Sequence, residues 1–281
     1  MLDQITPIVL TYNEAANIHR TLESLRWAKD IVVVDSFSDD ETIELVAQFP
    51  QVRLYQRRFD THEKQWNFAL QQTNINTEWV LALDADYVLT PEVVEEIKTL
   101  GPDGAVGGYT AEFIYCVHSK RLRGSAYLPV TVLYRRAHAV YRQDGHTQRV
   151  VIGGEVRQLR SPLLHDDRKS LSQWLRSQDR YTQLELHHLR EAQGETLGVP
   201  DRLRKTRWLF PFVIFFYCLF VKGAILDGWP GIHYAFQRML AEILLALYLI
   251  EEDLAGKLGS REAGKLDSRK EHKAVDLKGE T

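Results

Sequence analysis

The stretch Trp79-Val80-Leu81-Ala82-Leu83-Asp84-Ala85-Asp86-Tyr87 begins as an apolar run of strand length and ends in two carboxylates. Residues i and i+2 of an extended chain point to the same side, so Asp84 and Asp86 should project together from the end of a strand. Two like charges this close repel each other unless a cation lies between them, and carboxylate oxygens suit Mg2+ or Mn2+. The alternative is a strand that ends in an ordinary polar turn, where Asp is also common.

Upstream of this stretch, apolar segments of strand length alternate with segments of helical spacing. The predicted strands are residues 5–11, 31–34, 52–55 and 79–83, and the predicted helices are residues 18–27, 39–49 and 62–72. Asn13 or Asn17 is expected to cap the first helix, and Ser38 or Asp39 the second. This alternation predicts an α/β fold, with a mostly parallel sheet and helices on both faces.

Polar residues follow three of the predicted strands, at residues 11–14, 35–42 and 84–86. Sheets of this kind bind ligands at the carboxyl ends of their strands, so these segments should meet at one edge. The first strand is not followed by Gly-x-Gly-x-x-Gly, and the P-loop pattern is missing, which disfavours both standard phosphate cradles. A cation at Asp84 and Asp86 could hold a diphosphate instead.

Composition excludes several other classes. The 281 residues are 44% hydrophobic and 26% charged, as expected for one large globular domain or a domain with an appendage. A net charge of -3 gives no general attraction for nucleic acid, so no nucleic-acid partner is expected. Cys116 and Cys218 make no disulfide framework, and the chain reaches Asp3 and a strand pattern without a signal peptide. These features predict a cytoplasmic protein.

Three blocks of the chain resemble the family 2 glycosyltransferases of the GT-A fold. They are Pro7-Ile8-Val9-Leu10-Thr11-Tyr12-Asn13-Glu14, Val33-Val34-Asp35-Ser36-Phe37-Ser38-Asp39-Asp40-Glu41-Thr42 and Leu83-Asp84-Ala85-Asp86, in the family's order and spacing. Within the family the chain is most similar to the bacterial lipopolysaccharide-core glucosyltransferases, over residues 5 to about 252. The resemblance implies a Rossmann-like GT-A sheet, a nucleotide-diphosphate sugar donor, expected to be a UDP-sugar, and transfer with inversion.

The resemblance also implies the roles of individual residues. It assigns the nucleotide-sugar pocket to Thr11, Asn13, Glu14, Asp35, Lys64 and Asp84. Asp35 would bind the base or ribose, and Lys64 would face the diphosphate, unless it lies on a solvated helix face. Asp86 would be the principal ligand of Mg2+ or Mn2+, with Asp84 beside it. His165 would approach the metal or diphosphate, although a lone His after an apolar pair is more often structural.

The middle of the chain should hold the acceptor site and the general base. A helix is expected at residues 91–100, capped by Thr90, then strands at 107–117 and 127–134 and a helix at 170–188. Lipopolysaccharide-core relatives usually carry a His-Glu pair where this chain has His146 and Thr147. Threonine cannot act as a general base at neutral pH, so Asp144 and His146 are the candidates, and use of another acid in this subfamily is the alternative.

The C-terminal part predicts a membrane surface. Basic residues 202–207 lead into an apolar run, Trp208 to Val221, which is shorter than the ~20 residues of a spanning helix. Basic residues and an interfacial Trp suit a helix in the headgroup region of an anionic leaflet. A second apolar helix is predicted at residues 239–250, and packing of both helices on the catalytic domain is the alternative. The predicted division is therefore residues 1–200 catalytic, 201–255 membrane-associated helices and 256–281 a disordered charged tail.

Together these patterns predict a metal-dependent, inverting glycosyltransferase, peripheral on the inner face of the cell membrane. Its acceptor would be a glycolipid or another lipid-linked, lipopolysaccharide or exopolysaccharide saccharide, as in cell envelope polysaccharide biosynthesis. A polyprenyl-phosphate glycosyltransferase is one alternative, because a phosphate acceptor needs less help from a base. A nucleotidyltransferase is disfavoured, since residues 11–14 lack its Gly-rich, Arg-containing loop. A non-catalytic membrane-associated scaffold is the remaining alternative.

Overall fold

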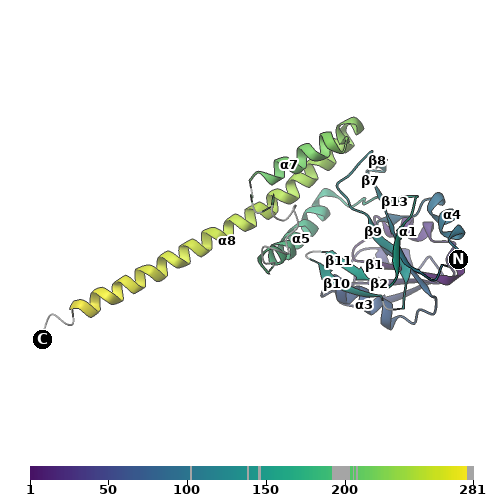
Figure 1. Ribbon diagram of the computed structural model, residues 1–281, viewed down its shortest axis with the longest axis horizontal. Helices are drawn as coiled ribbons and strands as arrows, with labels where there is room; N and C mark the ends of the chain where they lie inside the picture. The colour runs from purple at the N-terminus through teal and green to yellow at the C-terminus, as the bar shows by residue number, and fades with distance from the viewer. Residues whose placement is uncertain are drawn as a thin grey trace.

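A computed structural model describes residues 1–101, 103–137, 139–144, 147–191, 203–204, 206 and 208–276. After a short 3-10 turn, η1 (Leu2–Gln4), strands and helices alternate through the first hundred residues (Figure 1). The strands are β1 (Ile5–Thr11), β2 (Ile31–Asp35), β3 (Val52–Gln56) and β4 (Trp79–Asp84). The helices are α1 (Ile18–Ser24), α2 (Thr42–Val46), α3 (His62–Gln72) and α4 (Pro91–Thr99).

The main sheet has seven strands in the order β12-β6-β9-β4-β1-β2-β3. Its three further strands are β6 (Val106–Ala111), β9 (Val130–Arg135) and β12 (Glu155–Gln158). The strands β1 to β4 pair in parallel, and β12 is parallel to β6, whereas β9 runs antiparallel to both of its neighbours. The predicted α/β fold with a mostly parallel sheet is confirmed.

Apolar side chains alternate between two cores, one on each face of the sheet. Val33 and Leu81 belong to the core that includes residues of α1, α2 and α4, whereas Val32 and Val80 belong to the core that includes residues of α3. Because both faces of these strands are covered, their sequence reads as a continuous apolar run rather than an alternation.

A second sheet lies beside the main one, in the order β5-β13-β7-β8. Its strands are β5 (Tyr87–Val88), β13 (Leu163–His165), β7 (Phe113–Val117) and β8 (Lys120–Arg121). A separate two-stranded sheet pairs β10 (Val140–Asp144) antiparallel with β11 (Thr147–Val151). The single strand predicted over residues 107–117 is wrong in this respect, because the chain changes sheets at Glu112, between β6 and β7.

The ends of α2 also differ from the prediction. Its N-cap is Glu41, not Ser38 or Asp39, because Ser38 instead donates both its backbone N–H and its hydroxyl to Asp35. The helix stops at Val46, and Phe49 lies in a turn. Phe49 precedes Pro50, and the residue before a proline disfavours the helical backbone conformation. The first helix has Asn17 at its N-cap, but the Asn17 side chain makes no capping hydrogen bond. The Thr90 hydroxyl accepts from Val93 N at the start of α4, as predicted.

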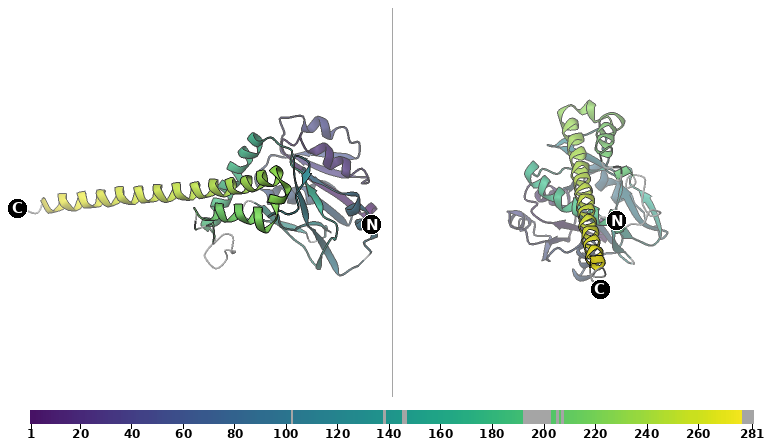
Figure 2. Two further views of the ribbon diagram at one scale, coloured as in Figure 1. Left: turned by 90° about the horizontal axis from the view of Figure 1, so that it is seen from above. Right: turned by 90° about the vertical axis from the view of Figure 1, so that its left-hand side faces the viewer.

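The C-terminal part is helical. It contains α5 (Leu171–Glu191), α7 (Phe210–Phe216), the π-turn η2 (Tyr217–Val221), the 3-10 turn η3 (Ala224–Asp227) and α8 (Trp229–Asp276). The second half of α8 extends away from the body of the molecule (Figures 1 and 2). In the described part of the chain, none of the helices has both the length and the apolar character needed to cross a membrane.

At its C-terminal end α8 continues as helix through residues 256–276, to Asp276. The division into residues 1–200, 201–255 and 256–281 stays a prediction.

Candidate active site

Three strand ends meet at one edge of the main sheet. Thr11, the last residue of β1, is in register with Asp35 of β2, and Leu10 is in register with Asp84 of β4. After β4 the chain turns through Asp86 into β5, which pairs antiparallel with β13. This pairing carries residues from the far end of the catalytic region to the Asp84–Asp86 turn.

Asp86 and His165 form a buried pair. Asp86 Oδ2 lies 3.1 Å from His165 Nε2, and both side chains are 13% exposed. Burial acts to raise the pKa of Asp86, but the adjacent imidazole outweighs it, so that this pKa is lowered. Burial acts to lower the pKa of His165, but the carboxylate outweighs it, so that this pKa is raised. Both shifts favour the charged forms, an imidazolium beside a carboxylate.

Aromatic rings surround His165. The ring centroids of Tyr87, Tyr115 and Tyr127 lie 5.3, 4.7 and 4.7 Å from the imidazole centroid, all nearly edge-on. The hydroxyls of Tyr87 and Tyr127 are hydrogen-bonded to each other. His165 Nδ1 is buried, with no hydrogen-bond partner among the described residues. These rings keep the imidazole in one orientation and limit its contact with water.

Glu14 and Lys169 form a second buried pair. Lys169 Nζ lies 2.5 Å from Glu14 Oε1, and the side chains are 17% and 13% exposed. Burial acts to lower the pKa of Lys169, but the carboxylates of Glu14, Asp167 and Asp86 outweigh it, so that this pKa is raised. Burial raises the pKa of Glu14, and Asp86 adds to the rise, while Lys169 opposes it. We take Lys169 as charged, because three carboxylates act on it.

Asp84 is a further buried carboxylate beside this pair of charges. Burial raises its pKa to about 6, and the neighbouring Asp86 adds to the rise. Two carboxylates and one imidazole, from Asp84, Asp86 and His165, are a donor set that suits Mn2+ or Mg2+. Among the residues that the structure describes, no three His, Cys, Asp or Glu side chains are close enough to form a ready-made metal site. The donor chemistry fits a divalent cation once His165 has lost its proton, because an imidazolium has no lone pair to offer.

The start of α1 holds the site together. Asn17 donates from Nδ2 to Glu14 Oε2 at 2.8 Å and to Asp167 Oδ1 at 2.9 Å. Arg20, one turn later, donates to the backbone oxygen of Asp166 at 2.6 Å. These bonds fix residues 166–169 against β1, and so fix Lys169 and His165 relative to the strand ends.

The end of β2 is a closely bonded loop. Asp35 is fully buried and accepts hydrogen bonds from Ser38 and, at 3.3 Å, from Gln56 Nε2. Asn13, which has a φ of 54°, exchanges two hydrogen bonds with Asp39, at 2.6 and 2.9 Å. These two hydrogen bonds hold the loops after β1 and β2 together, and both of them involve the Asn13 side chain.

The structure brings most of the predicted site residues together, from three strand ends and β13. They are Thr11, Asn13, Glu14, Asp35, Asp84, Asp86 and His165. Lys64 lies in the first turn of α3 instead, 62% exposed and 3.4 Å from Asp60, as the solvated-face alternative predicts. Asp144 ends β10, in register with Thr147, and His146 lies outside the described residues.

Sequence reasoning missed Lys169 and assigned Asn17 only to helix capping. The signal for Lys169 was its position four residues after His165, in a polar segment that follows a short apolar strand. The signal for Asn17 was its position three residues after Glu14, on the first turn of a helix that leaves the same strand end.

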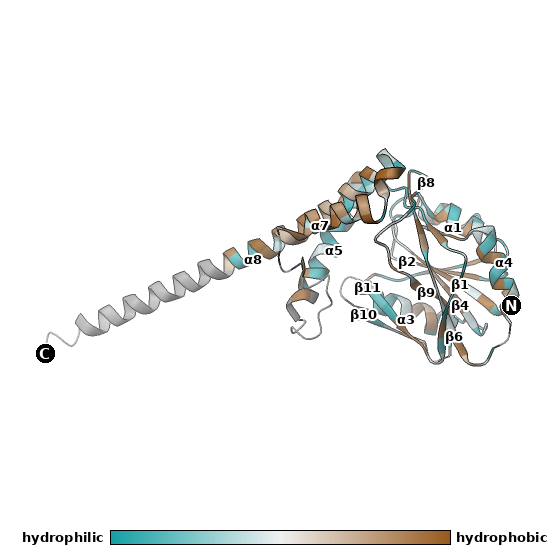
Figure 3. Ribbon diagram, turned by 45° about the horizontal axis from the view of Figure 1, so that its top comes forward, coloured by the Kyte–Doolittle hydropathy of each residue, from teal (hydrophilic) through white to brown (hydrophobic). Residues whose placement is uncertain are grey.

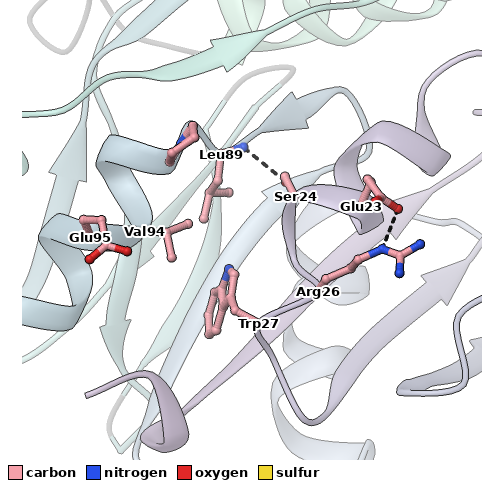
Figure 4. A pocket seen from close by; sticks show the side chains of 8 residues that line it. Glu23, Ser24, Arg26, Trp27, Leu89, Val94 and Glu95 are labelled. Carbon is pink, nitrogen blue, oxygen red and sulfur yellow. Dashed lines mark hydrogen bonds and ion pairs between the residues drawn. The ribbon is translucent and has the colours of Figure 1, made fainter.

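A separate hollow of about 300 Å3 lies between α1 and α4 (Figure 4). Trp27, Leu89 and Val94 are among its lining residues, and Leu89 N donates to Ser24 Oγ at its edge. None of the predicted site residues lines this hollow. We therefore place the functional site at the buried charges of the strand ends.

Comparison with known proteins agrees with the resemblance seen in the sequence. An uncharacterized glycosyltransferase of Rickettsia conorii is 24% identical over 256 residues, which cover 85% of this chain and 89% of that one. One from Rickettsia bellii is 32% identical over 96 residues, covering 34% of this chain and 32% of its own length. The chain thus spans about a third of the length of that second relative.

Solved structures give more distant likenesses. S. aureus TarS in complex with UDP-GlcNAc aligns with 89% of this chain and 92% of its own, at 14% identity and a TM-score of 0.47. Glucosyl-3-phosphoglycerate synthase from Mycobacterium tuberculosis, in complex with Mn2+, UDP and phosphoglyceric acid, covers 65% of this chain and 76% of its own, at 12% identity and a TM-score of 0.44. Likenesses this distant carry no argument about ligands.

The family model for glycosyl transferase family 2 matches residues 6–160, more than half of the chain. The matched segment contains β1 to β12 and all of the predicted strand-end residues except His165. The mixed sheet, with its parallel strands β1 to β4, agrees with the expected GT-A-type fold. The chain belongs to glycosyl transferase family 2.

Proposed function

We propose that this chain is a glycosyltransferase that moves a sugar from a nucleotide-diphosphate donor, a UDP-sugar, to a hydroxyl group on a glycolipid or another lipid-linked saccharide. The observation that carries the proposal is the meeting of two buried ion pairs, Asp86 with His165 and Glu14 with Lys169, at the ends of β1 and β4. Buried charges are costly to a fold, and titratable groups with perturbed pKa values cluster at functional sites.

The donor would lie across the strand ends. Asp35 would hydrogen-bond the base or ribose, and Thr11, whose buried hydroxyl oxygen has no hydrogen-bond partner among the described residues, would line the same pocket. The diphosphate carries negative charge, and Lys169 and His165 are the buried cationic groups nearest the carboxylates of the turn. Asp86, with Asp84, would hold Mg2+ or Mn2+, which when bound neutralises charge on the leaving diphosphate.

The acceptor hydroxyl must lose its proton as it attacks. The proposed bases are Asp144, the last residue of β10, and His146, which lies outside the described residues. Attack from the face opposite the diphosphate inverts the anomeric centre. Relatives are expected to carry Glu at the position of Thr147, which is in register with Asp144. A phosphate acceptor needs less help from a base, so a polyprenyl phosphate is a second candidate acceptor. A transfer assay that offers polyprenyl phosphate and saccharide-bearing lipids separately distinguishes the two acceptors.

A thermal-shift panel tests the donor site. The full chain is melted with UDP, GDP, CMP or dTDP, each with and without Mn2+, as wild type, Asp86→Asn and the control Glu95→Gln. Glu95 is an exposed residue of α4, paired with Lys98. We expect one nucleoside diphosphate to stabilise wild type and the control only with Mn2+, and to leave Asp86→Asn unshifted. If no nucleotide shifts the wild-type melting temperature, the transferase proposal fails and the scaffold alternative takes its place.

A further inference from the structure

Hydrophobic residues gather on the antiparallel pair formed by α7 and the start of α8, with η2 and η3 between them (Figure 3). Many of their side chains are exposed. We call this set the hairpin surface: Trp208, Phe212, Phe216, Phe220, Leu226 and Trp229. Trp229 is 80% exposed, Trp208 73%, Leu226 67% and Phe220 61%. Single exposed apolar residues are ordinary, but so many large ones on one small element mark an interaction surface.

The hairpin surface is separate from the packed inside of the same element. Cys218 and Leu219 of η2 are buried against Tyr234 and Ala235 of α8. Phe212, Phe216 and Phe220 follow at intervals of four, so they lie on one side of the helix, and the rings of Phe216 and Phe220 stack at 6.0 Å. The hairpin therefore has its own core, and the exposed aromatic side chains are not needed for it.

Glycines fix the turn of the hairpin. Gly223 and Gly228 have φ of 72° and 66°, where side chains are strained. A Cβ on Gly231 would lie 1.8 Å from the backbone oxygen of Ala224, so that only glycine allows this close approach. Leu226 and Trp229 are thus held at the tip instead of folding back onto the protein.

Basic residues lie beside the tip. Lys120 and Arg121 of β8 are exposed, and the next turn of chain packs against the hairpin, since a Cβ on Gly124 would lie 2.5 Å from the backbone oxygen of Lys222. Arg123 lies beside them and is 67% exposed, but its Nε is 3.4 Å from Asp227, so that carboxylate balances its charge. Exposed aromatic residues flanked by lysine and arginine match the two layers of an anionic bilayer surface, acyl boundary and headgroups.

The hairpin is also in contact with the candidate active site. The ring of Tyr115 lies 4.7 Å from that of His165 and 4.8 Å from that of Tyr234 in α8. The Tyr234 hydroxyl accepts a hydrogen bond from Ala126 N at 2.8 Å. The ring of Tyr115 thus contacts the imidazole of His165 on one side and Tyr234, in the core of the hairpin, on the other.

We infer that the hairpin surface inserts into the headgroup region of an anionic bilayer without crossing it, and so sets the strand-end site beside the membrane. The insertion itself needs no catalysis; its purpose, the delivery of a lipid-borne acceptor, rests on the proposed function. Trp208 and Trp229, at the two ends of the surface, are the side chains best suited to the interface between headgroups and acyl chains.

Vesicle sedimentation of the full chain tests the inference. Vesicles of phosphatidylcholine alone are compared with vesicles that also contain phosphatidylglycerol, for wild type, Phe216→Ser/Phe220→Ser and Trp229→Ser. Val156→Ser is the control, because Val156 is 47% exposed but lies on β12, at the edge of the main sheet. We expect wild type and the control to bind the anionic vesicles, and each hairpin variant to bind about tenfold more weakly or worse.

Two results would overturn the inference: equal vesicle binding by wild type and the hairpin variants, or no binding by wild type. Suppose that wild type does not bind vesicles, is a dimer by light scattering, and Phe216→Ser/Phe220→Ser is a monomer. The hairpin surface then binds a second copy of the chain instead of a membrane. The nucleotide melting panel, run on the same variants, keeps the proposals apart. Vesicle binding without any nucleotide response would refute the transferase while the membrane inference stands.

Discussion

The strand ends and the C-terminal hairpin depart from the usual distribution of side chains in opposite directions. At the ends of β1 and β4 the protein buries Glu14, Asp86 and Lys169, whose side chains are 13 to 17% exposed. In the hairpin it exposes Trp208 and Trp229 by 73 and 80%. A fold selected only for stability would do neither, because burying charge is costly and exposing an aromatic ring forgoes about 1.5–3 kcal/mol.

The two regions therefore call for different partners. Buried charges that are already paired within the protein can exchange those partners for a charged ligand, with geometry set by the surrounding bonds. Exposed rings need an apolar surface, and they impose little geometry on it. At the strand ends, replacing one charged atom should therefore cause a large loss of activity. At the hairpin, the loss of binding should follow the apolar area that a substitution removes.

The largest effect should come from Asp86→Asn. The substitution keeps the shape of the side chain but removes the charge that pairs with His165 and would hold the cation. We expect sugar transfer to fall by about 100- to 1000-fold, whereas Glu95→Gln should transfer at the wild-type rate. A radiolabelled or coupled transfer assay measures this, with circular dichroism to verify folding. Near-normal transfer by a folded Asp86→Asn variant would contradict the role given to the turn.

The next effect concerns a buried ion pair network in the helical part. Arg204 lies 2.7 Å from Glu185 of α5 and 2.9 Å from Glu242 of α8, and the three side chains are 17, 10 and 5% exposed. Arg204→Met leaves both carboxylates without this cation, so we expect the free energy of unfolding to fall by about 3 kcal/mol in chemical denaturation. Arg204→Met/Glu242→Gln should recover part of the loss.

Arg26→Met is the matched control for Arg204. Arg26 pairs with Glu23 at 2.7 Å, but the two side chains are 69% and 46% exposed. Its loss should cost less than about 1 kcal/mol. If the two arginine variants were equally stable, burial would not be what distinguishes these ion pairs.

The position of the site could be predicted from the sequence, because it depends on local rules. Apolar runs between helical segments predicted a parallel sheet, and such a sheet gathers its strand ends at one edge. The positions of Asp35, Asp84 and Asp86 follow directly from that reasoning. The start of α4 follows from another local rule, because Thr90 and Pro91 match a helix cap.

The partners of the site residues could not be predicted in the same way. Lys169 reaches Glu14 through the pairing of β13 with β5 and through the bonds of Asn17 and Arg20 to residues 166–167. The strand β5 is two residues long, too short to be recognised from its composition. Ser38 was a plausible helix cap by residue type, but a nearby buried carboxylate, Asp35, competes for its donors. Side chains choose among several allowed partners through contacts between distant segments, which one local pattern does not contain.

A medium-sized effect would sharpen the comparison by opening the hairpin alone. In Gly231→Ala the added Cβ would meet the backbone oxygen of Ala224 at 1.8 Å, whereas Gly101→Ala, the control, meets nothing within 4 Å. Overpacking of this kind costs enough to increase local opening by about tenfold or more. Cys218, buried inside the hairpin, should then react faster with a thiol reagent, while Cys116 on β7 should not.

The chemistry of Cys116 makes the comparison quantitative. Burial raises the pKa of the Cys116 thiol to about 11, so at pH 8 little of it is thiolate, the reactive form. Its labelling rate should rise with pH, in wild type and in Gly231→Ala alike. Equal acceleration of both cysteines in Gly231→Ala would mean that the hairpin and the sheet open together.

The smallest effect tests whether the Asp84–Asp86 turn depends on the helix that follows it. Thr90 is 7% exposed, and its hydroxyl accepts from Val93 N at 3.4 Å, so Thr90→Ala should lower the free energy of unfolding by about 1 kcal/mol. Thr99→Ala, at the exposed other end of α4, should cost about 0.5 kcal/mol or less. Because the carboxylates are held by β4 and by the pairing with β13, neither variant should change the nucleotide-dependent melting shift. A lost shift in Thr90→Ala alone would show that α4, and not only the strand ends, positions the turn.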